Sequence, residues 1–254
     1  MANLDMDQTK SGCKHYQRMC KFVSPCCSKL FSCRLCHDEE ISSHKLNRHA
    51  VEKIVCCACT VTQGISNKCI SCHVKFGNYF CAICRLYDDK DKGQFHCELC
   101  GICRVGGRIN FKHCETCGFC LPNSIIESHK CIESNSKRNC PICLEDIHNS
   151  TIASHVPSCG HVLHTSCYES LLKAGDYRCA ICGVSVVSMK EQWKMLDTEI
   201  EHTPMPEEYS NIKQWILCKD CHKVSEVKFH ILGLKCQPCG SYNTCGTDAP
   251  STEV

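Results

Sequence analysis

The sequence has few of the residues that build a large hydrophobic core. Aromatic residues make up 7% of the 254 positions, and cysteine accounts for much of the 43% hydrophobic fraction. No apolar run approaches the ~20 residues that a membrane-spanning helix requires. We therefore expect neither a membrane partner nor a single large core. Small modules with little apolar surface to bury need cross-links instead.

The sequence also lacks an excess of charge of either sign. The chain has 29 Lys and Arg against 27 Asp and Glu, which gives a formal net charge of +2 without a dense basic block. Proteins that bind nucleic acid usually gather basic residues on one face, with interleaved aromatics where the strand is single. The near-neutral chain therefore disfavours nucleic acid as the main partner.

Cysteine, in contrast, is abundant, with 31 residues beside 15 histidines. Such a share indicates a scaffold built on disulfides or metals. The polar segment Met1–Lys10 has no apolar stretch of the kind a signal peptide needs, so we expect a protein of the nucleus and cytoplasm. In reducing compartments dense cysteine more often binds metal, and C-x2-C pairs interspersed with histidine have zinc-ligand spacing. The sequence predicts zinc.

The ligand spacing predicts a small, metal-dominated α+β protein of four zinc modules in series, with short strands. We expect the modules at 8–75, 76–138, 139–183 and 213–246, and a helix with a linker at 184–212. In this helix Ser188 and Glu191 have the spacing of a capping box, and Pro204 prevents its continuation. Helical spacing also predicts one apolar face, made by Met189, Trp193, Leu196 and Ile200.

The second module contains an internal repeat, in which the sequence HCELCGIC from His96 returns as HCETCGFC from His113. Adjacent side chains of an extended chain point in opposite directions, so one tetrahedral zinc is not expected to take a whole unit. We expect each unit to serve two successive metals. The predicted groups are Cys81, Cys84, Cys97 and Cys100; His96, Cys103, Cys114 and Cys117; and His113, Cys120, His129 and Cys131.

The third module carries the most specific pattern, C-x2-C-x15-C-x-H-x2-H-x2-C-x11-C-x2-C. This pattern resembles the RING finger family with two central histidines. The resemblance implies a cross-brace of two zinc sites that ties the ends of the module together. The first site would use Cys140, Cys143, His164 and Cys167, and the second Cys159, His161, Cys179 and Cys182.

Resemblance to a RING finger implies a ubiquitin ligase without a catalytic residue of its own. Such a ligase holds a ubiquitin-charged conjugating enzyme so that a substrate lysine can attack the thioester, and its catalysis is positioning. By the family pattern the conjugating enzyme would dock on Ile142, Leu171, Ala180 and Ile181. Two positions depart from that pattern. Ala180 stands where proline is usual, and Gly183 where many members have an arginine that helps to clamp ubiquitin.

Short motifs elsewhere, in one consistent order, extend the resemblance to most of the chain. They include CKHY at 13–16, CRLCH at 33–37, TPMP at 203–206 and SYNT at 241–244. Together with the RING they resemble the RING finger and CHY zinc finger ubiquitin ligases. The resemblance implies three zinc ions in the first module, with their pairing left open. Because adjacent side chains of an extended chain point in opposite directions, we expect Cys26 and Cys27 to serve different metals. The implied ligands are Cys13, His15, Cys26, Cys27, Cys33, Cys36, His37, His44, Cys56, Cys59, Cys69 and Cys72.

The fourth module has the C-x2-C-x14-C-x2-C pattern of a zinc ribbon, with Cys218, Cys221, Cys236 and Cys239 as ligands. We expect a β-hairpin around Val227–Leu234 between the two metal-binding turns. In the family that the chain resembles, the ribbon and the N-terminal modules are expected to recruit protein substrates, with transcription factors among the candidates. Taken alone, the ribbon is as well explained by a structural role.

Four ligands per metal give nine zinc ions for the whole chain. Cys57, His49 and His73 adjoin predicted ligands and remain alternatives to them. Cys20 and Cys245 are left over, and neither has an evident activating base that would make it a nucleophile. The alternative to a ligase is a non-catalytic zinc-binding module for protein interaction or nucleic-acid association.

Overall fold

The computed structural model describes residues 11–250. The segment Met1–Lys10, in which we expect no signal peptide, lies outside the described residues. The chain forms two compact units. The first includes the chain up to Cys114 and the segment Cys120–Ile126, and the second includes Glu115–Phe119 and the chain from Glu127 onward. Within residues 11–250 no helix has the length and hydropathy of a membrane span. Short strands, few helices and many Cys/His clusters confirm the predicted metal-dominated α+β class.

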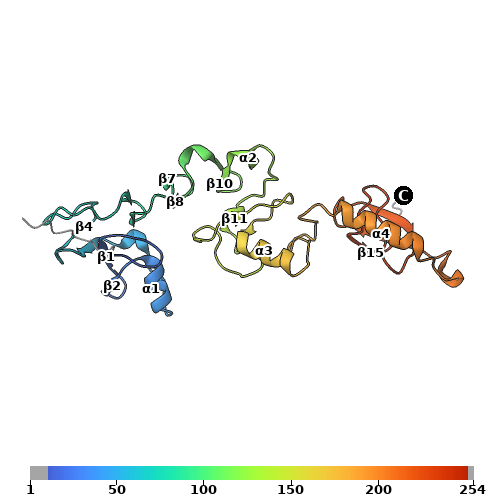
Figure 1. The fold of residues 1–254 in the computed structure, drawn as a ribbon, viewed down its shortest axis with the longest axis horizontal. Helices are drawn as coiled ribbons and strands as arrows, with labels where there is room; N and C mark the ends of the chain where they lie inside the picture. Colours follow the sequence, from blue (N-terminus) through green and yellow to red (C-terminus); the bar gives the residue numbers. More distant parts are fainter. Residues whose placement is uncertain (1–10, 251–254) are drawn as a thin grey trace, which may run out of the picture. The chain divides into compact units, whose positions relative to one another are not determined.

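A four-stranded antiparallel sheet of order β2-β1-β3-β4 begins the first unit (Figure 1). Alternate residues of β3 are buried, as expected of a strand with one face on a core. The elements of this region are β1 (Cys20–Val23), β2 (Leu30–Phe31), α1 (Arg34–Glu40), η1 (Arg48–Ala50), β3 (Lys53–Cys56) and β4 (Thr62–Gly64).

The core under this sheet is shared between the first two predicted modules. Phe22 and Ile54 of the sheet pack in one cluster with Phe76 and Tyr87, which come from the second module. All four side chains are at most 2% exposed. The CHY region and the hairpin that follows it are therefore stabilised by one common core.

Three short hairpins follow in the chain. Gly101 and Gly118 occupy equivalent places in the repeated sequence and adopt φ of +68° and +71°, which favours glycine. The repeat is thus a repeated hairpin. The elements are β5 (Tyr79–Cys81), β6 (Leu86–Asp88), β7 (Phe95–Cys97), β8 (Ile102–Arg104), η2 (Arg108–Asn110), β9 (Phe111–Cys114), β10 (Phe119–Pro122) and α2 (Asn123–Ile126).

The predicted RING lies in the second unit and is built around one helix and one small hairpin. Ile147, Val162 and Leu163 are each at most 5% exposed and form its modest interior. Because this interior is small, the module depends on its metal ligands for stability. The elements are η3 (Asn135–Lys137), β11 (Ser154–His155), β12 (Leu163–His164) and α3 (Thr165–Lys173).

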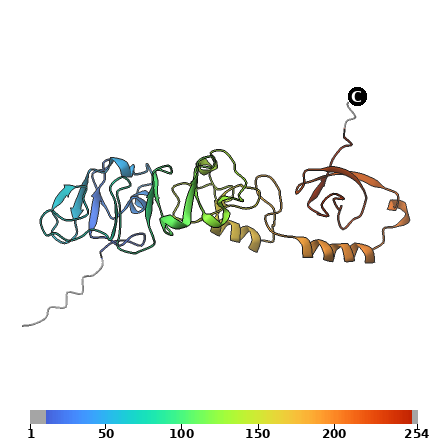
Figure 2. The same cartoon turned by 90° about the horizontal axis from the view of Figure 1, so that it is seen from above.

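Helix α4 (Lys190–His202) packs on the ribbon (Figure 2) and ends before Pro204, as predicted. Its predicted apolar face is confirmed, because the four predicted residues are all half-buried: Met189, Trp193, Leu196 and Ile200. Trp193 makes aromatic contacts with Tyr177 and Tyr242, at centroid distances of 5.5 and 5.8 Å. The predicted capping box is wrong. Met189 is the N-cap and makes no side-chain cap bond, while the carboxylate of Glu191 accepts from Lys194.

The ribbon is a three-stranded antiparallel sheet of order β14-β13-β15. The expected hairpin at Val227–Leu234 is wrong, since its strand part ends at Lys228. The hairpin instead pairs β13 with β14 on either side of the first cysteine turn, which itself reverses the chain. The elements are η4 (Glu207–Tyr209), β13 (Lys213–Cys218), β14 (Val224–Lys228) and β15 (Thr244–Gly246).

Candidate metal centres and RING surface

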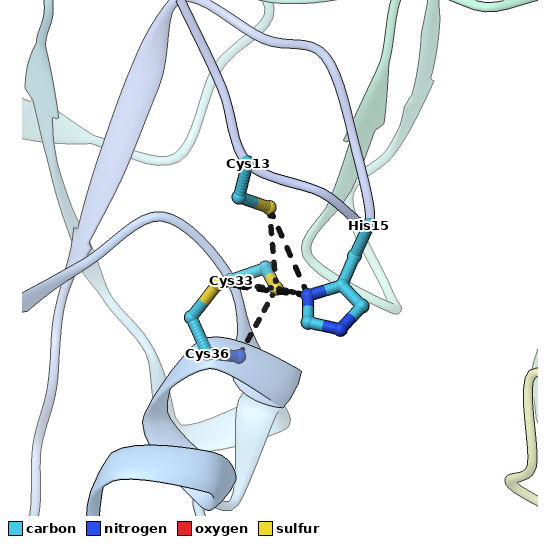
Figure 3. A group of neighbouring side chains, drawn as sticks. All are labelled: Cys13, His15, Cys33 and Cys36. Carbon is cyan, nitrogen blue, oxygen red and sulfur yellow. Dashed lines mark hydrogen bonds between the residues drawn. The ribbon is translucent and has the colours of Figure 1, made fainter.

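The first candidate centre brings together Cys13, His15, Cys33 and Cys36 (Figure 3). His15 Nδ1 lies 3.5 Å from Cys33 Sγ and 3.6 Å from Cys36 Sγ, and the two sulfurs are 3.6 Å apart. A tetrahedral zinc with Zn–S bonds of about 2.3 Å places its ligand sulfurs roughly 3.8 Å apart. The observed distances fit that geometry. The other ring nitrogen of His15 meets Glu39 at 3.2 Å, which orients the ring.

The second centre corrects the expectation for Cys26 and Cys27. Both belong to one group with His37 and His44. The rule of opposite side chains applies to extended chain, whereas these two cysteines lie in a turn after β1. Here His44 Nε2 is buried without a hydrogen-bond partner, and a zinc ion would satisfy it. The Asp38 carboxylate contacts His37 Nδ1 at 3.0 Å, so His37 Nε2 faces Cys26 at 3.3 Å.

The third centre consists of Cys56, Cys59, Cys69 and Cys72. Sulfur separations of 3.7 Å between Cys56 and Cys72, and 3.4 Å between Cys59 and Cys69, again suit one tetrahedral ion. The structure thus gathers all twelve candidate ligands of the first module into three groups of four. Among the alternatives left open, His49 turns to the carbonyl of Ile83 at 3.0 Å.

In the second module the predicted sharing of each repeat unit between two metals is correct, but the predicted pairing is wrong. One group is Cys81, Cys84, His96 and Cys103, and the next is Cys97, Cys100, His113 and Cys120. The reason is the strand register. His96 and Cys103 are directly opposite each other on β7 and β8, so they face the same metal.

The third group predicted for this module is also divided. His129 Nε2 lies 3.5 Å from Cys117 Sγ and 3.0 Å from Cys131 Sγ, while His113 and Cys120 belong to the preceding group. Each unit of the repeat contributes its histidine and its last cysteine to the metal site that precedes the site of the unit's other two cysteines. The prediction placed them in the following site, and this error recurs in the third group. Cys114 ends strand β9.

The RING ligands meet across the module as the cross-brace requires. Cys143 Sγ lies 3.3 Å from His164 Nδ1, and Cys179 Sγ lies 3.7 Å from His161 Nδ1. Cys167 contacts the thiols of Cys140 and Cys143, whereas Cys159 contacts that of Cys179. Residues from both ends of the module therefore meet in each of the two sites. His164 Nε2 is buried without a hydrogen-bond partner, so only Nδ1 is engaged.

In three of these centres a close sulfur neighbour favours the ionised form of one cysteine thiol. Contact with the Cys103 thiol lowers the pKa of Cys84 to about 5. Contact with the Cys120 thiol lowers the pKa of Cys100 to about 4. In the RING, contact with Cys159 lowers the pKa of Cys179 to about 4. The same contacts raise the pKa of the partner thiols Cys103, Cys120 and Cys159, so one thiolate in each pair is favoured at the expense of the other. Zinc binds the thiolate form, so its binding would release the proton that the pair retains. The cysteines among residues 11–250 form no disulfide.

The predicted docking residues of the RING lie where a partner could reach them. Ile142 and Ile181 each follow the first cysteine of a C-x2-C pair by two residues and are 39% and 46% exposed. Ala180 is exposed, and Leu171 on α3 is half-buried. Exposed isoleucines at both cysteine turns give the RING an apolar surface at its metal sites.

Comparison with known proteins decides the family. Residues 13–79 match the CHY zinc finger family, 138–183 the Ring finger domain and 187–245 the zinc-ribbon family. The chain is 44% identical to the E3 ubiquitin-protein ligase SRFP1 of Oryza sativa subsp. japonica, over 94% of this chain and 92% of that protein. It is 41% identical to the E3 ubiquitin-protein ligase RZFP34 of Arabidopsis thaliana, over 94% of this chain and 86% of that protein. It belongs to the RING finger and CHY zinc finger family of E3 ubiquitin-protein ligases.

Longer proteins also contain this arrangement. The chain is 40% identical to zinc finger protein BRUTUS of Arabidopsis thaliana, over 94% of this chain but 19% of that protein. The matched families and the clusters of cysteine and histidine show that this RING-type ligase binds zinc.

A buried polar clamp joins the RING of this ligase to its ribbon, and the sequence did not indicate it. Asn243 Nδ2 donates to the carbonyl of Gly183 at 2.8 Å and to Asp220 Oδ1 at 2.9 Å. The Asp220 carboxylate also accepts from Ser185 N–H at 2.8 Å and from Ser241 Oγ at 2.6 Å. Asn243 and Ser241 are 6% and 4% exposed. Of these groups only Ser241 and Asn243 belong to a motif noted in the sequence, SYNT.

Proposed function

We propose that this ligase docks a ubiquitin-charged conjugating enzyme on the apolar surface made by Ile142, Leu171, Ala180 and Ile181. The exposure of Ile142 and Ile181 at the two cysteine turns is the observation that carries the proposal. The substrate lysine attacks the thioester carbonyl, and the conjugating enzyme's thiolate leaves. The ligase contributes position, which can lower such a barrier by several kcal/mol.

The ligase does not form a covalent intermediate with ubiquitin in this proposal. Cys20, one of the cysteines outside the metal groups, is 1% exposed, and burial raises the pKa of its thiol to about 12. A buried, protonated thiol can neither reach a thioester nor attack it. Cys245 is half-buried and contacts the carbonyl of Leu217.

We further propose that the chain binds nine zinc ions. Five groups of candidate ligands have been named above with their members, and the described residues contain four more such groups. The zinc ions would hold modules whose apolar interiors are small, so binding energy would serve as folding energy. Measurement of the zinc content of the purified protein by mass spectrometry under native conditions tests the number.

The N-terminal modules and the ribbon would recruit protein substrates, with transcription factors among the candidates. Three C-x2-C turns of the first unit each present an exposed apolar side chain: Ile70, Ile83 and Leu99, which are 67%, 56% and 66% exposed. Exposed apolar side chains of this size are suited to protein contacts. The nucleus and cytoplasm are the proposed place of action, since zinc-binding C-x2-C pairs suit a reducing compartment.

Autoubiquitination with a panel of conjugating enzymes tests the ligase proposal. Ile142→Ala should abolish the ubiquitin ladder while the zinc content stays unchanged. Ile152→Ala is the matched control, because Ile152 is an isoleucine of the same module with a similar exposure of 45%. Silence of a fully zinc-loaded wild type across the panel would contradict the proposal and favour a non-catalytic interaction module.

A further inference from the structure

A lysine of the ribbon packs over the last turn of the RING. Gly183 follows the final RING cysteine and adopts φ of +72°, a conformation that side chains rarely adopt. The stem of Lys219 covers it, since the Cγ and Cδ atoms lie 3.8 Å from the place a Cβ at Gly183 would occupy. Gly183 itself has no side chain, and the space above it is occupied by the side chain of Lys219 from the ribbon.

Hydrogen bonds on both sides fix the backbone of Lys219. Its N–H donates to the carbonyl of Asn243 at 2.8 Å, and the Asn243 side chain donates to the carbonyl of Gly183. The neighbouring Asp220 accepts from Ser185. The backbone of Lys219 is therefore held against the RING by the polar clamp, so binding of a partner has only the side chain left to order.

The ammonium group of Lys219 is not paired with a carboxylate of the described residues, although the side chain is half-buried. The adjacent carboxylate of Asp220 is occupied by donors from Ser185, Ser241 and Asn243. An ammonium group that no described carboxylate neutralises is available to a partner.

Lys219 lies over Gly183, which follows the last RING ligand and is two residues from Ile181 of the proposed docking surface. We propose that Lys219 is a binding residue for the ubiquitin-charged conjugating enzyme. Its ammonium group donates a hydrogen bond to a carboxylate or carbonyl oxygen of that partner, and no bond to Lys219 forms or breaks. This inference rests on the proposed function and extends it, since it makes the ribbon a part of the docking surface.

The test is single-turnover discharge of ubiquitin from a charged conjugating enzyme to free lysine, which requires no protein substrate. Lys219→Ala should slow discharge about tenfold, the value of one charge-assisted hydrogen bond, and Lys219→Glu should slow it further. Lys219→Arg should retain most of the rate because it keeps the charge. Lys228→Ala is the matched control, since Lys228 is an exposed lysine of the same ribbon.

The outcomes separate this inference from the ligase proposal. Wild-type rates in both Lys219→Ala and Lys219→Glu, with discharge abolished in Ile142→Ala, would overturn the role of Lys219 and leave the ligase intact. An inactive, zinc-loaded wild type would overturn both. A loss in Lys219→Ala that Lys219→Arg does not restore would also overturn it, because a structural defect would then explain the loss. Equal zinc content in all variants is the control for folding.

Discussion

Removal of the Asn243 side chain should weaken the second unit by a predictable amount. Asn243 donates to one carbonyl, that of Gly183, and to one carboxylate, that of Asp220. A hydrogen bond between neutral groups contributes about 1 kcal/mol net and one to a charged group about 2 kcal/mol. Asp220 keeps its bonds from Ser185 and Ser241, so no charge is left unpaired. We expect Asn243→Ala to lower the free energy of unfolding by about 2 to 3 kcal/mol.

The chain contains a built-in probe for this measurement. It has two tryptophans, and Trp193 lies between Tyr177 of the RING and Tyr242 of the ribbon. Urea unfolding followed by tryptophan fluorescence should show the midpoint of Asn243→Ala lowered by about 1 M. The free zinc concentration must be fixed, because metal binding adds to the apparent stability.

The matched control for this prediction is Asn211→Ala. Asn211 is exposed just before β13, and its loss should change the free energy of unfolding by less than about 0.5 kcal/mol. If Asn243→Ala unfolds at the same urea concentration as the wild type, the clamp does not stabilise the RING against the ribbon. The argument for the fixed position of Lys219 would then lose its support.

Three further predictions concern other parts of the chain. Lys235 and Tyr242 lower the pKa of Asp197, so its contribution is present above the unfolded carboxyl pKa and disappears as pH falls through the lowered value. Asp197→Asn should therefore lower the free energy of unfolding by the same amount at about pH 6 and at about pH 8, as measured by urea unfolding. The loss should be at most about 1 kcal/mol because the pair is partly exposed. A strong chelator should release the zinc and abolish the circular dichroism of the folded chain, and retained structure would contradict metal-dependent folding. Ile83→Ser with Leu99→Ser should keep discharge to free lysine but reduce substrate ubiquitination, and unchanged substrate ubiquitination would exclude these turns as recruiting sites.

Ligand identity was readable from sequence because zinc requires particular residues at short spacings. C-x2-C pairs form compact turns whatever surrounds them, whereas the twelve candidates of the first module were implied by the family resemblance; the structure brings all twelve together in three groups. Pairing was harder. It depends on which side chains share a face, and that depends on local backbone conformation, which is extended at His96 but turned at Cys26 and Cys27.

Contacts between modules could not be predicted because they join residues far apart in sequence. The clamp between Gly183 and Asn243 spans sixty residues, and nothing in the spacing of cysteines indicates it. The contribution of Phe76 and Tyr87 to the core of the first module could not be predicted either, because ligand spacing assigned both residues to the second module. Zinc spacing identifies modules, whereas burial and buried polar bonds decide which of them act together.

The contacts between the first two modules differ in kind from the contacts between the RING and the ribbon, and this difference bears on function. The first two modules share an apolar core, which favours stability without fixing a particular side chain at the surface. The RING and the ribbon are joined by directional bonds from Asn243 and Asp220, and such bonds fix the position of the groups they hold. The proposed docking surface would benefit from bonds of the second kind, since a ligase that works by position gains from fixed groups. A polar clamp beside the last RING ligand is therefore better explained as a device for positioning than as a simple linker.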